Sequence, residues 1–377
     1  MNRILFYYQV RQMFVMASLF AFLLGIGAEV RADWQAEWQQ TVEAAKKEGR
    51  LVVYGGEEIT HQEILDEFMK KYPGIKVVTG SGRGSTLGPR ILAERRAGKY
   101  LVDLFSGGPS TPYRVLYRGN ALDPIKPMLL LPEVKDTSKW YGGKHYYADP
   151  QGEYLFIFEG SISGGASVAY NTELVNPKEF TSYFDLLNPK WKGKISFYDP
   201  TASGGGLNSI LSLYENPQLG PPYIKRLFKE MQITIFRSRR QGPDWLAAGR
   251  FPLCFSCRDI TRAMQQGLPV NQIPPENLKE TEPVIGGGGS SVLVLINRAP
   301  HPNAAKLFIN WYLSREGQMV WQRVINTKVL ESSDSMRIDI PKDDVIIDNK
   351  RVPGVNYRMI AFRDPRPAVR LMREILR

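Results

Sequence analysis

The sequence predicts an α/β protein of two lobes, each a mostly parallel sheet flanked by helices, joined by two crossover strands. Three observations support this fold. Strand and helix patterns alternate over residues 50–108 with short connections, which is typical of a parallel sheet with helices on both faces. A second alternating unit covers residues 195–256. Two extended segments, GGASVAYNTELV and GGGGSSVLVLINRA, bracket that unit. We therefore predict a first lobe over residues 33–162, a second over 163–284, and a return to the first lobe with C-terminal helices over 285–377.

Length and charge agree with two globular domains and argue against a nucleic-acid groove. The chain has 377 residues and a formal net charge of +11, and chains of this length commonly form about two domains. Its lysines and arginines are spread along the sequence rather than clustered in runs. Nucleic-acid binding surfaces concentrate positive charge, so we expect no nucleic-acid partner.

The N-terminal residues 1–32 have the pattern of a cleavable signal peptide. Arg3 and Arg11 precede the apolar run MFVMASLFAFLLGIG, which is short for a membrane span of about 20 apolar residues. Small residues at Val30 and Ala32 predict cleavage before Asp33, with cleavage after Ala28 as the alternative. No cysteine lies near either position, so we expect a protein that is exported to the periplasm without a lipid anchor.

The two cysteines, Cys254 and Cys257, form C-F-S-C with no second pair to complete a zinc site. An oxidising compartment would permit a disulfide. However, FPLCFSC has a strand pattern, in which residues three apart point to opposite faces, and this geometry argues against the bond. The expectation from the sequence is that the two thiols stay unpaired.

Three early strands end in small or polar residues, where ligands of parallel sheets bind. Arg83 is the sharpest candidate, because a guanidinium in a glycine-serine loop can bind a carboxylate or phosphate with two hydrogen bonds; the alternative is an ordinary exposed loop arginine. The expected ligand-binding residues of the first lobe are Gly56, Glu57, Ser81, Arg83, Ser85, Ser106 and Gly107.

The segment YDPTASGGGLN lies between the strand pattern KISF and the helix pattern SILSLYEN. The first N–H groups of a helix lack internal partners and attract anions, and glycines let a ligand approach the backbone closely. The alternative is a glycine-rich turn with Ser203 as helix cap. Tyr198 fits the core as well as a ligand wall, and Arg258 with Asp259 fits an ion pair between lobes. The expected ligand-binding residues of the second lobe are Tyr198, Thr201, Ser203, Gly204, Gly205, Ser256 and Arg258.

No constellation in the sequence predicts catalysis. The three histidines, His61, His145 and His301, lie in unrelated contexts. Neither G-x-S-x-G nor H-E-x-x-H occurs, and GSGRGST lacks the lysine of a phosphate-binding Walker loop. We therefore expect no catalytic residue and no cofactor, although an exported enzyme on the same scaffold remains an alternative of another class.

The chain resembles the periplasmic solute-binding proteins of ABC importers, in the branch that includes ferric-ion-binding proteins. The resemblance is carried by LVVYGGEE, ASVAYNTELV, ISFYDPTASGGGLN and, most specifically, APHPNAAKLFINWYLSREGQ. It implies a type II periplasmic binding fold with a ligand in a cleft between lobes. It also implies delivery to an inner-membrane permease with its ATPase, and we expect a monomer.

The resemblance does not extend to the residues that bind iron in these relatives. Ferric-binding relatives use two adjacent tyrosines where this sequence has Ser256, Cys257, Arg258 and Asp259, and their acidic ligand on the third loop is replaced by Ser106-Gly107-Gly108. Ferric iron prefers hard oxygen anions. We therefore expect no metal and a small anionic organic solute, namely a carboxylate, phosphonate or phosphate ester. The alternatives are ferric iron or an iron chelate, and a chemosensory role with the same ligand.

Overall fold

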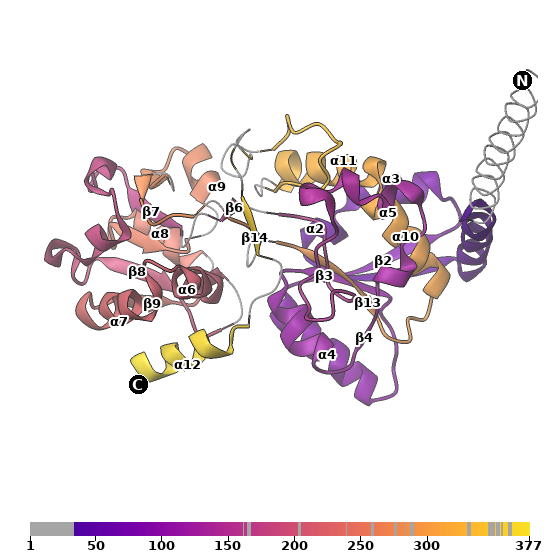
Figure 1. The fold of residues 1–377 in the computed structure, drawn as a ribbon, viewed down its shortest axis with the longest axis horizontal. Helices are drawn as coiled ribbons and strands as arrows, with labels where there is room; N and C mark the ends of the chain where they lie inside the picture. The colour runs from indigo at the N-terminus through magenta and orange to yellow at the C-terminus, as the bar shows by residue number, and fades with distance from the viewer. Residues whose placement is uncertain are drawn as a thin grey trace, which may run out of the picture.

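The computed structural model places two α/β lobes side by side, with a small sheet between them (Figure 1). The structure describes residues 34–160, 162–163, 167–202, 205–238, 240–257, 260–274, 277–282, 284–286, 290–329, 333–345, 351, 355, 357–360 and 364–377. The predicted signal peptide lies outside these residues. Within them, no helix is long and apolar enough to cross a membrane.

The first lobe contains a six-stranded mixed sheet. Its order is β2-β1-β3-β13-β4, and β5 also pairs with β13. Strands β2, β1 and β3 are parallel, whereas β13 runs antiparallel to β3. The parallel strands end at the same sheet edge, which is where the three predicted ligand loops begin. The strands are β1 (Arg50–Gly55), β2 (Lys76–Ser81), β3 (Leu104–Gly107), β4 (Leu122–Asp123), β5 (Phe156–Ile157) and β13 (Val292–Ile296).

Helices cover this sheet and supply its aromatic core. The helix at 34–48 packs through Val42 and Ala45, and α10 is buried along most of its length. Phe68 contacts both Phe308 and Trp311 at ring-centroid distances of 5.0 and 5.3 Å. The labelled helices of this lobe are α2 (Glu57–Thr60), α3 (Gln62–Lys71), α4 (Gly84–Arg96), the π-helix η1 (Pro112–Tyr117), α5 (Pro132–Lys135), α10 (Pro302–Leu313), α11 (Arg315–Val324) and the π-helix η10 (Ile325–Val329).

The second lobe contains a five-stranded sheet of order β11-β7-β10-β8-β9. Strands β10, β8 and β9 are parallel, and β7 is antiparallel to both β10 and β11. One sheet face packs on α6 and α7, and the other on a smaller cluster that includes Leu246 and Ile260. The elements are β7 (Val168–Asn171), β8 (Ile195–Tyr198), α6 (Gly205–Glu215), α7 (Gly220–Glu230), β9 (Thr234–Phe236), α8 (Gln241–Ala247), β10 (Leu253–Phe255), α9 (Ile260–Gln265) and β11 (Val270–Gln272).

A three-stranded sheet connects the lobes. Two crossover strands join the lobes, as expected, and they are β6 (Ile162–Ser163) and β12 (Val284–Gly286), which pair antiparallel. They lie just before the strands in which the sequence predicted the crossings: β7 belongs to the sheet of the second lobe and β13 to that of the first. A third strand, β14 (Arg358–Ile360), pairs parallel with β12. The lobe boundaries inferred from the sequence remain predictions, but the chain crosses between lobes once more than expected.

The last helix, α12 (Arg366–Ile375), corrects the expectation that residues 285–377 return to the first lobe with the C-terminal helices. Ala368, Val369, Leu371 and Met372 of α12 join the core of the second lobe. The physical reason is burial: the apolar face of α12, which follows β14 in the chain, packs against α6 and α7 of the second lobe. Figure 1 shows α12 below α6 and β9.

Candidate ligand site

The structure brings the three loops of the first lobe together. Gly55 pairs with Ser81 in adjacent strands, and Tyr54 pairs with Phe105 on the other side. The hydroxyl of Thr60 lies 3.4 Å from that of Ser81. These pairings place the loops after β1, β2 and β3 at one sheet edge.

The individual loop residues differ in exposure and bonding. Gly56 begins α2, and its N–H donates to the Glu58 carboxylate at 3.2 Å. Glu57, Ser81 and Ser85 are exposed, whereas Gly107 is half-buried. Ser85 lies in the first turn of α4 rather than in a loop.

Arg83 is the N-cap residue of α4, so its side chain starts where the helix presents unpaired N–H groups. It is exposed. Its guanidinium makes no hydrogen bond or ion pair with the residues that the structure describes, and no acidic residue lies in the first turn of α4. The positive end of the helix dipole and a free guanidinium therefore coincide at this position.

Three buried hydroxyls near these loops have no hydrogen-bond partner in the described part of the chain: those of Ser106, Ser110 and Ser290. Ser106 is fully buried and Ser290 is 3% exposed. The pairing of Gly107 with Val292 brings Ser290 beside the segment that follows β3, where a Cβ atom on Gly108 would lie 4.0 Å from the Ser290 carbonyl oxygen. An unsatisfied buried polar group costs about 1–3 kcal/mol, so a ligand that bonds these hydroxyls would recover that free energy.

Sequence reasoning identified Ser106 but missed Ser110 and Ser290. Ser290 follows the glycine run GGGG, whose pattern indicates only a crossover. Its proximity to the third loop depends on β13 entering the sheet beside β3, and no local pattern indicates that pairing.

In the second lobe, β8 leads into α6 through the segment 199–204, as the sequence predicted. Gly206 in the first turn of α6 is buried. A Cβ atom there would fall well inside contact distance of the carbonyl oxygens of Tyr198 and Asp199. The helix start therefore packs directly on the backbone of the preceding loop, which only glycine permits. Tyr198 stacks on Phe236, with ring centroids 5.3 Å apart.

Asp199 organises the turn before α6. It accepts hydrogen bonds from the N–H and hydroxyl of Thr201 at 2.9 and 2.6 Å, and from Arg237 at 3.1 Å. Burial alone would raise the pKa of Asp199, but the bonds from Thr201 and the Arg237 ion pair outweigh it and hold that pKa below its usual value. The exposed Thr201 thus uses its hydroxyl proton within the turn and offers a ligand its oxygen only as an acceptor.

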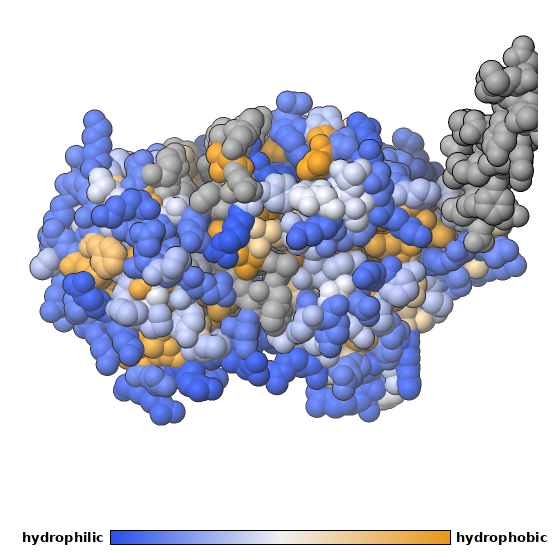
Figure 2. All heavy atoms as spheres, viewed as in Figure 1, coloured by the Kyte–Doolittle hydropathy of each residue, from blue (hydrophilic) through white to orange (hydrophobic). Residues whose placement is uncertain are grey.

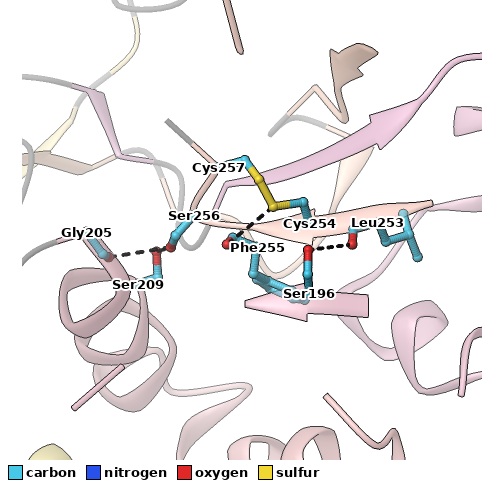
Figure 3. Close-up of a disulfide and its surroundings, with 8 residues drawn as sticks. All are labelled: Ser196, Gly205, Ser209, Leu253, Cys254, Phe255, Ser256 and Cys257. Atoms are coloured by element: carbon cyan, nitrogen blue, oxygen red, sulfur yellow. Dashed lines mark hydrogen bonds between the residues drawn. A yellow bond between two sulfur atoms is a disulfide. The ribbon is translucent and has the colours of Figure 1, made fainter. Parts of the chain in front are cut away.

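Ser256 connects the strand β10 to the start of α6. Its hydroxyl bonds the hydroxyl of Ser209 and lies 3.4 Å from the Gly205 carbonyl. Ser256 is 4% exposed. It therefore supports Gly205 from inside the protein rather than offering its own hydroxyl to a ligand. Figure 3 shows Ser256 between the disulfide and α6.

Cys254 and Cys257 form a disulfide, which contradicts the expectation that they stay unpaired. The strand ends at Phe255, and Ser256 adopts a positive φ of 56°. This left-handed residue turns the chain, so that Cys257 returns to the face of Cys254 with a Cα–Cα distance of 5.8 Å. The alternating strand geometry assumed from the sequence ends at Phe255, two residues before Cys257, and therefore does not keep the two sulfurs apart.

We expect a Cys254→Ser/Cys257→Ser variant to lose roughly 2 kcal/mol of unfolding free energy, the chain-entropy value for so short a closed loop. Ser256 would also lose the constraint that holds its unfavourable φ. Urea denaturation of the variant and the wild type, both under non-reducing conditions, measures the difference. Equal midpoints would show that the bond adds nothing to the fold.

Ser203, Gly204 and Arg258 lie outside the described residues. The remaining predicted residues form two groups, one on each lobe. The first comprises the loops after β1, β2 and β3, and the second comprises Tyr198, Thr201, Gly205 and Ser256. That both groups contact one ligand stays a prediction.

Metal chemistry finds little support among the described residues. They contain no group of three or more His, Cys, Asp or Glu side chains arranged to hold a metal ion. At the position of the relatives' tyrosine pair, Cys257 is bonded to Cys254 and Ser256 is bonded to Ser209. Neither side chain is an anionic oxygen ligand of the kind that ferric iron prefers.

Solved structures of similar fold include proteins with different ligands. Iron-bound HitA from Pseudomonas aeruginosa is 18% identical, with 86% of this chain and 99% of that chain covered and a TM-score of 0.61. A Trichodesmium protein (IdiA, FutA) in complex with iron and citrate is 20% identical, with coverages of 86% and 99% and a TM-score of 0.62. AfuA from Actinobacillus pleuropneumoniae, with fructose-6-phosphate bound, is 17% identical, with coverages of 87% and 96% and a TM-score of 0.61.

These likenesses confirm the predicted type II periplasmic binding fold. The model of one family, described as bacterial extracellular solute-binding protein, matches residues 63–328, which is more than half of the chain. The matched range includes the loops after β2 and β3, the start of α6 and both strands β6 and β12. The chain therefore belongs to the family of bacterial extracellular solute-binding proteins.

Proposed function

We propose that this protein is the periplasmic solute-binding component of an ABC importer and that it captures a small anionic organic solute between its lobes. The solute is a carboxylate, a phosphonate or a phosphate ester. The protein delivers the solute, chemically unchanged, to a membrane permease. It acts as a monomer and needs no cofactor. The family supports the solute-binding role, and the chemistry of the two loop groups supports the class of solute.

The observation that carries the proposal is the exposed guanidinium of Arg83 at the start of α4, which has no hydrogen-bond or ion-pair partner among the described residues. An arginine can bind a carboxylate or phosphate with two parallel hydrogen bonds, and the helix N-terminus adds backbone N–H donors. Thr111, next to Ser110, lies close to Gly84, next to Arg83. The unpartnered hydroxyls of Ser106 and Ser110 therefore stand on the chain segment beside this cation.

The second lobe supplies a weaker, neutral contribution. The start of α6 offers N–H groups, and Asp199 is paired with Arg237, so its negative charge is largely compensated. An anion held by Arg83 would meet helix N–H groups at the start of α6, where the carboxylate of Asp199 is already paired. Such a division of donors suits a ligand enclosed by two lobes.

Ferric iron is the second candidate, because two structures of similar fold contain iron. Glu57 is exposed at the first loop and could supply one oxygen ligand. One carboxylate does not hold ferric iron, and the disulfide occupies the place of the expected tyrosines. The organic anion is favoured for these reasons, and AfuA with bound fructose-6-phosphate is a solved example of the same fold with such a ligand.

A thermal-shift titration tests the proposal. Citrate, a sugar phosphate and a phosphonate are each added to the purified protein, with ferric chloride in parallel. A ligand present at 100 times its Kd stabilises by about 2.7 kcal/mol, which raises the Tm of a chain this long by roughly 3 °C. We expect at least one anion to produce this shift. A shift with ferric iron and none with any anion would overturn the proposed solute class.

A further inference from the structure

A second cationic cavity lies away from the ligand loops. Its volume is about 640 Å³, within the range of small-molecule sites. One wall comes from the first lobe, at Tyr113–Arg118, and the other from Asp364 and α12, which pack on the second lobe. We call this cavity the arginine basin. Its guanidinium-bearing residues are Arg114, Arg118, Arg366, Arg370, Arg373 and Arg377.

Positive charge exceeds negative charge in the arginine basin. Among its described lining residues, two acidic side chains, those of Asp364 and Glu374, accompany six arginine side chains. Asp364 is already bonded to Arg366, with an Nε–Oδ1 distance of 2.8 Å and an Nη2–Oδ2 distance of 2.6 Å. These bonds lower the pKa of Asp364, and the field of Arg118 lowers it further, so Asp364 stays ionised and its charge is taken up.

Three arginines of the basin have no hydrogen-bond or ion-pair partner in the part of the chain that the structure describes. Arg370, Arg373 and Arg377 are exposed, and they make no hydrogen bond or ion pair with any residue in the described ranges. Arg370 and Arg373 lie on α12, whose other face, with Val369 and Met372, is buried, and Arg377 follows the end of that helix. Hydrophilic side chains gather along the lower edge of the molecule, where α12 lies in Figure 1 (Figure 2). Like charges held this close repel one another, and a bound anion would relieve that repulsion.

The arginine basin is separate from the predicted ligand residues. None of its residues belongs to the loops after β1, β2 and β3 or to the start of α6. Its first-lobe residues lie on the π-helix η1 and at the end of that helix, whereas the predicted ligand residues of this lobe lie in or next to the ends of β1, β2 and β3. An occupant of the basin would therefore add to the ligand of the loops rather than replace it.

We propose that the arginine basin is a second anion site, which takes a small anion carrying several phosphate charges. Guanidinium groups bind phosphate oxygens with two hydrogen bonds, and several of them can surround one polyphosphate. The volume of about 640 Å³ is that of a small-molecule site. Since the walls come from both lobes, the occupant favours the arrangement in which the lobes are close, and it thereby couples to the solute.

Isothermal titration calorimetry with inorganic pyrophosphate, at low ionic strength, tests this site. The Arg370→Ala/Arg373→Ala variant is expected to bind pyrophosphate roughly 30-fold more weakly than the wild type, because two charge-assisted contacts are lost. Arg118→Ala, on the opposite wall, is expected to weaken binding as well. It provides a second variant should the α12 double variant fold poorly.

Two control variants separate binding in the basin from general charge attraction and from binding at the solute loops. Lys225→Ala/Lys229→Ala removes the same charge from the exposed face of α7 and is expected to leave pyrophosphate affinity within about threefold of the wild type. Arg83→Ala removes the cation of the proposed solute site, and this variant is also expected to leave the affinity for pyrophosphate unchanged. No measurable binding to the wild type, or equal losses in the α12 and α7 variants, would overturn the proposal. If only Arg83→Ala lost pyrophosphate affinity, the anion would bind at the solute loops, and the proposal of a second site would be overturned too. A failure of the second site would leave the result of the solute titration unaffected.

Discussion

Gly206→Ala is expected to cost about 3 kcal/mol of unfolding free energy or more, at the upper end of what overpacking costs. The added methyl group would overlap the carbonyl oxygens of Tyr198 and Asp199, which are backbone atoms and cannot rotate away. Either α6 shifts away from the loop or the loop opens. Urea denaturation of the purified variant measures the loss, and the solute affinity should fall with it because both sides of the second-lobe site move.

The control for this variant is Gly82→Ala. Gly82 is an exposed loop glycine where a Cβ atom would meet only the Leu87 side chain at 3.5 Å, an ordinary contact. Its unfolding free energy should stay within about 0.5 kcal/mol of the wild type. If Gly206→Ala were as stable as Gly82→Ala, the close packing of α6 on its loop would play no part in stability.

Arg83→Ala is expected to weaken the binding of the anionic solute by about 2–3 kcal/mol, which is roughly a 30- to 150-fold increase in Kd. The variant leaves the enclosed anion without its cation. Because Arg83 is exposed and makes no side-chain contact with described residues through hydrogen bonds or ion pairs, the fold should be unaffected. Calorimetry with the anion that gives the largest thermal shift measures the change.

Two comparisons sharpen the Arg83 experiment. Arg83→Lys keeps the charge but loses the two-pronged geometry, so an intermediate affinity would indicate bidentate binding. Arg90→Ala, on the exposed face of the same helix α4, removes an equal charge that is already paired with Glu94. Affinity equal to wild type in Arg83→Ala would reduce Arg83 to a solvated loop charge.

The regular parts of the fold were predictable because hydrophobic periodicity is local. The sequence indicated the helix at 34–48, the three strands β1, β2 and β3, and the passage from β8 to α6. It also indicated that Pro302 starts a helix, which is α10. In each case the pattern of buried residues repeats within one element, so no information from distant residues is needed.

The remaining features depend on single backbone angles or on distant partners. The helical pattern that begins at Pro302 continues past residue 314, but the structure divides it there into α10 and α11, and the Ser314 hydroxyl accepts a hydrogen bond from the Gly317 N–H at 3.1 Å. The disulfide depends on the positive φ of Ser256. The apolar face of α12 predicts burial but not which lobe it covers. Likewise, the unpartnered hydroxyls of Ser110 and Ser290 come near the third loop only because β13 lies beside β3.

Within the described ranges, the chain starts on the first lobe and ends on the second, because α12 packs on the second lobe after the chain has returned to the first. The helix at 34–48 consequently lies on one lobe and α12 on the other. The separation of these two helices must change whenever the lobes rotate against each other, so a pair of spectroscopic labels on them would act as a gauge of opening and closing. A chain with only the two crossings β6 and β12 would carry both helices on the same lobe, and the distance between them would not change as the lobes open and close.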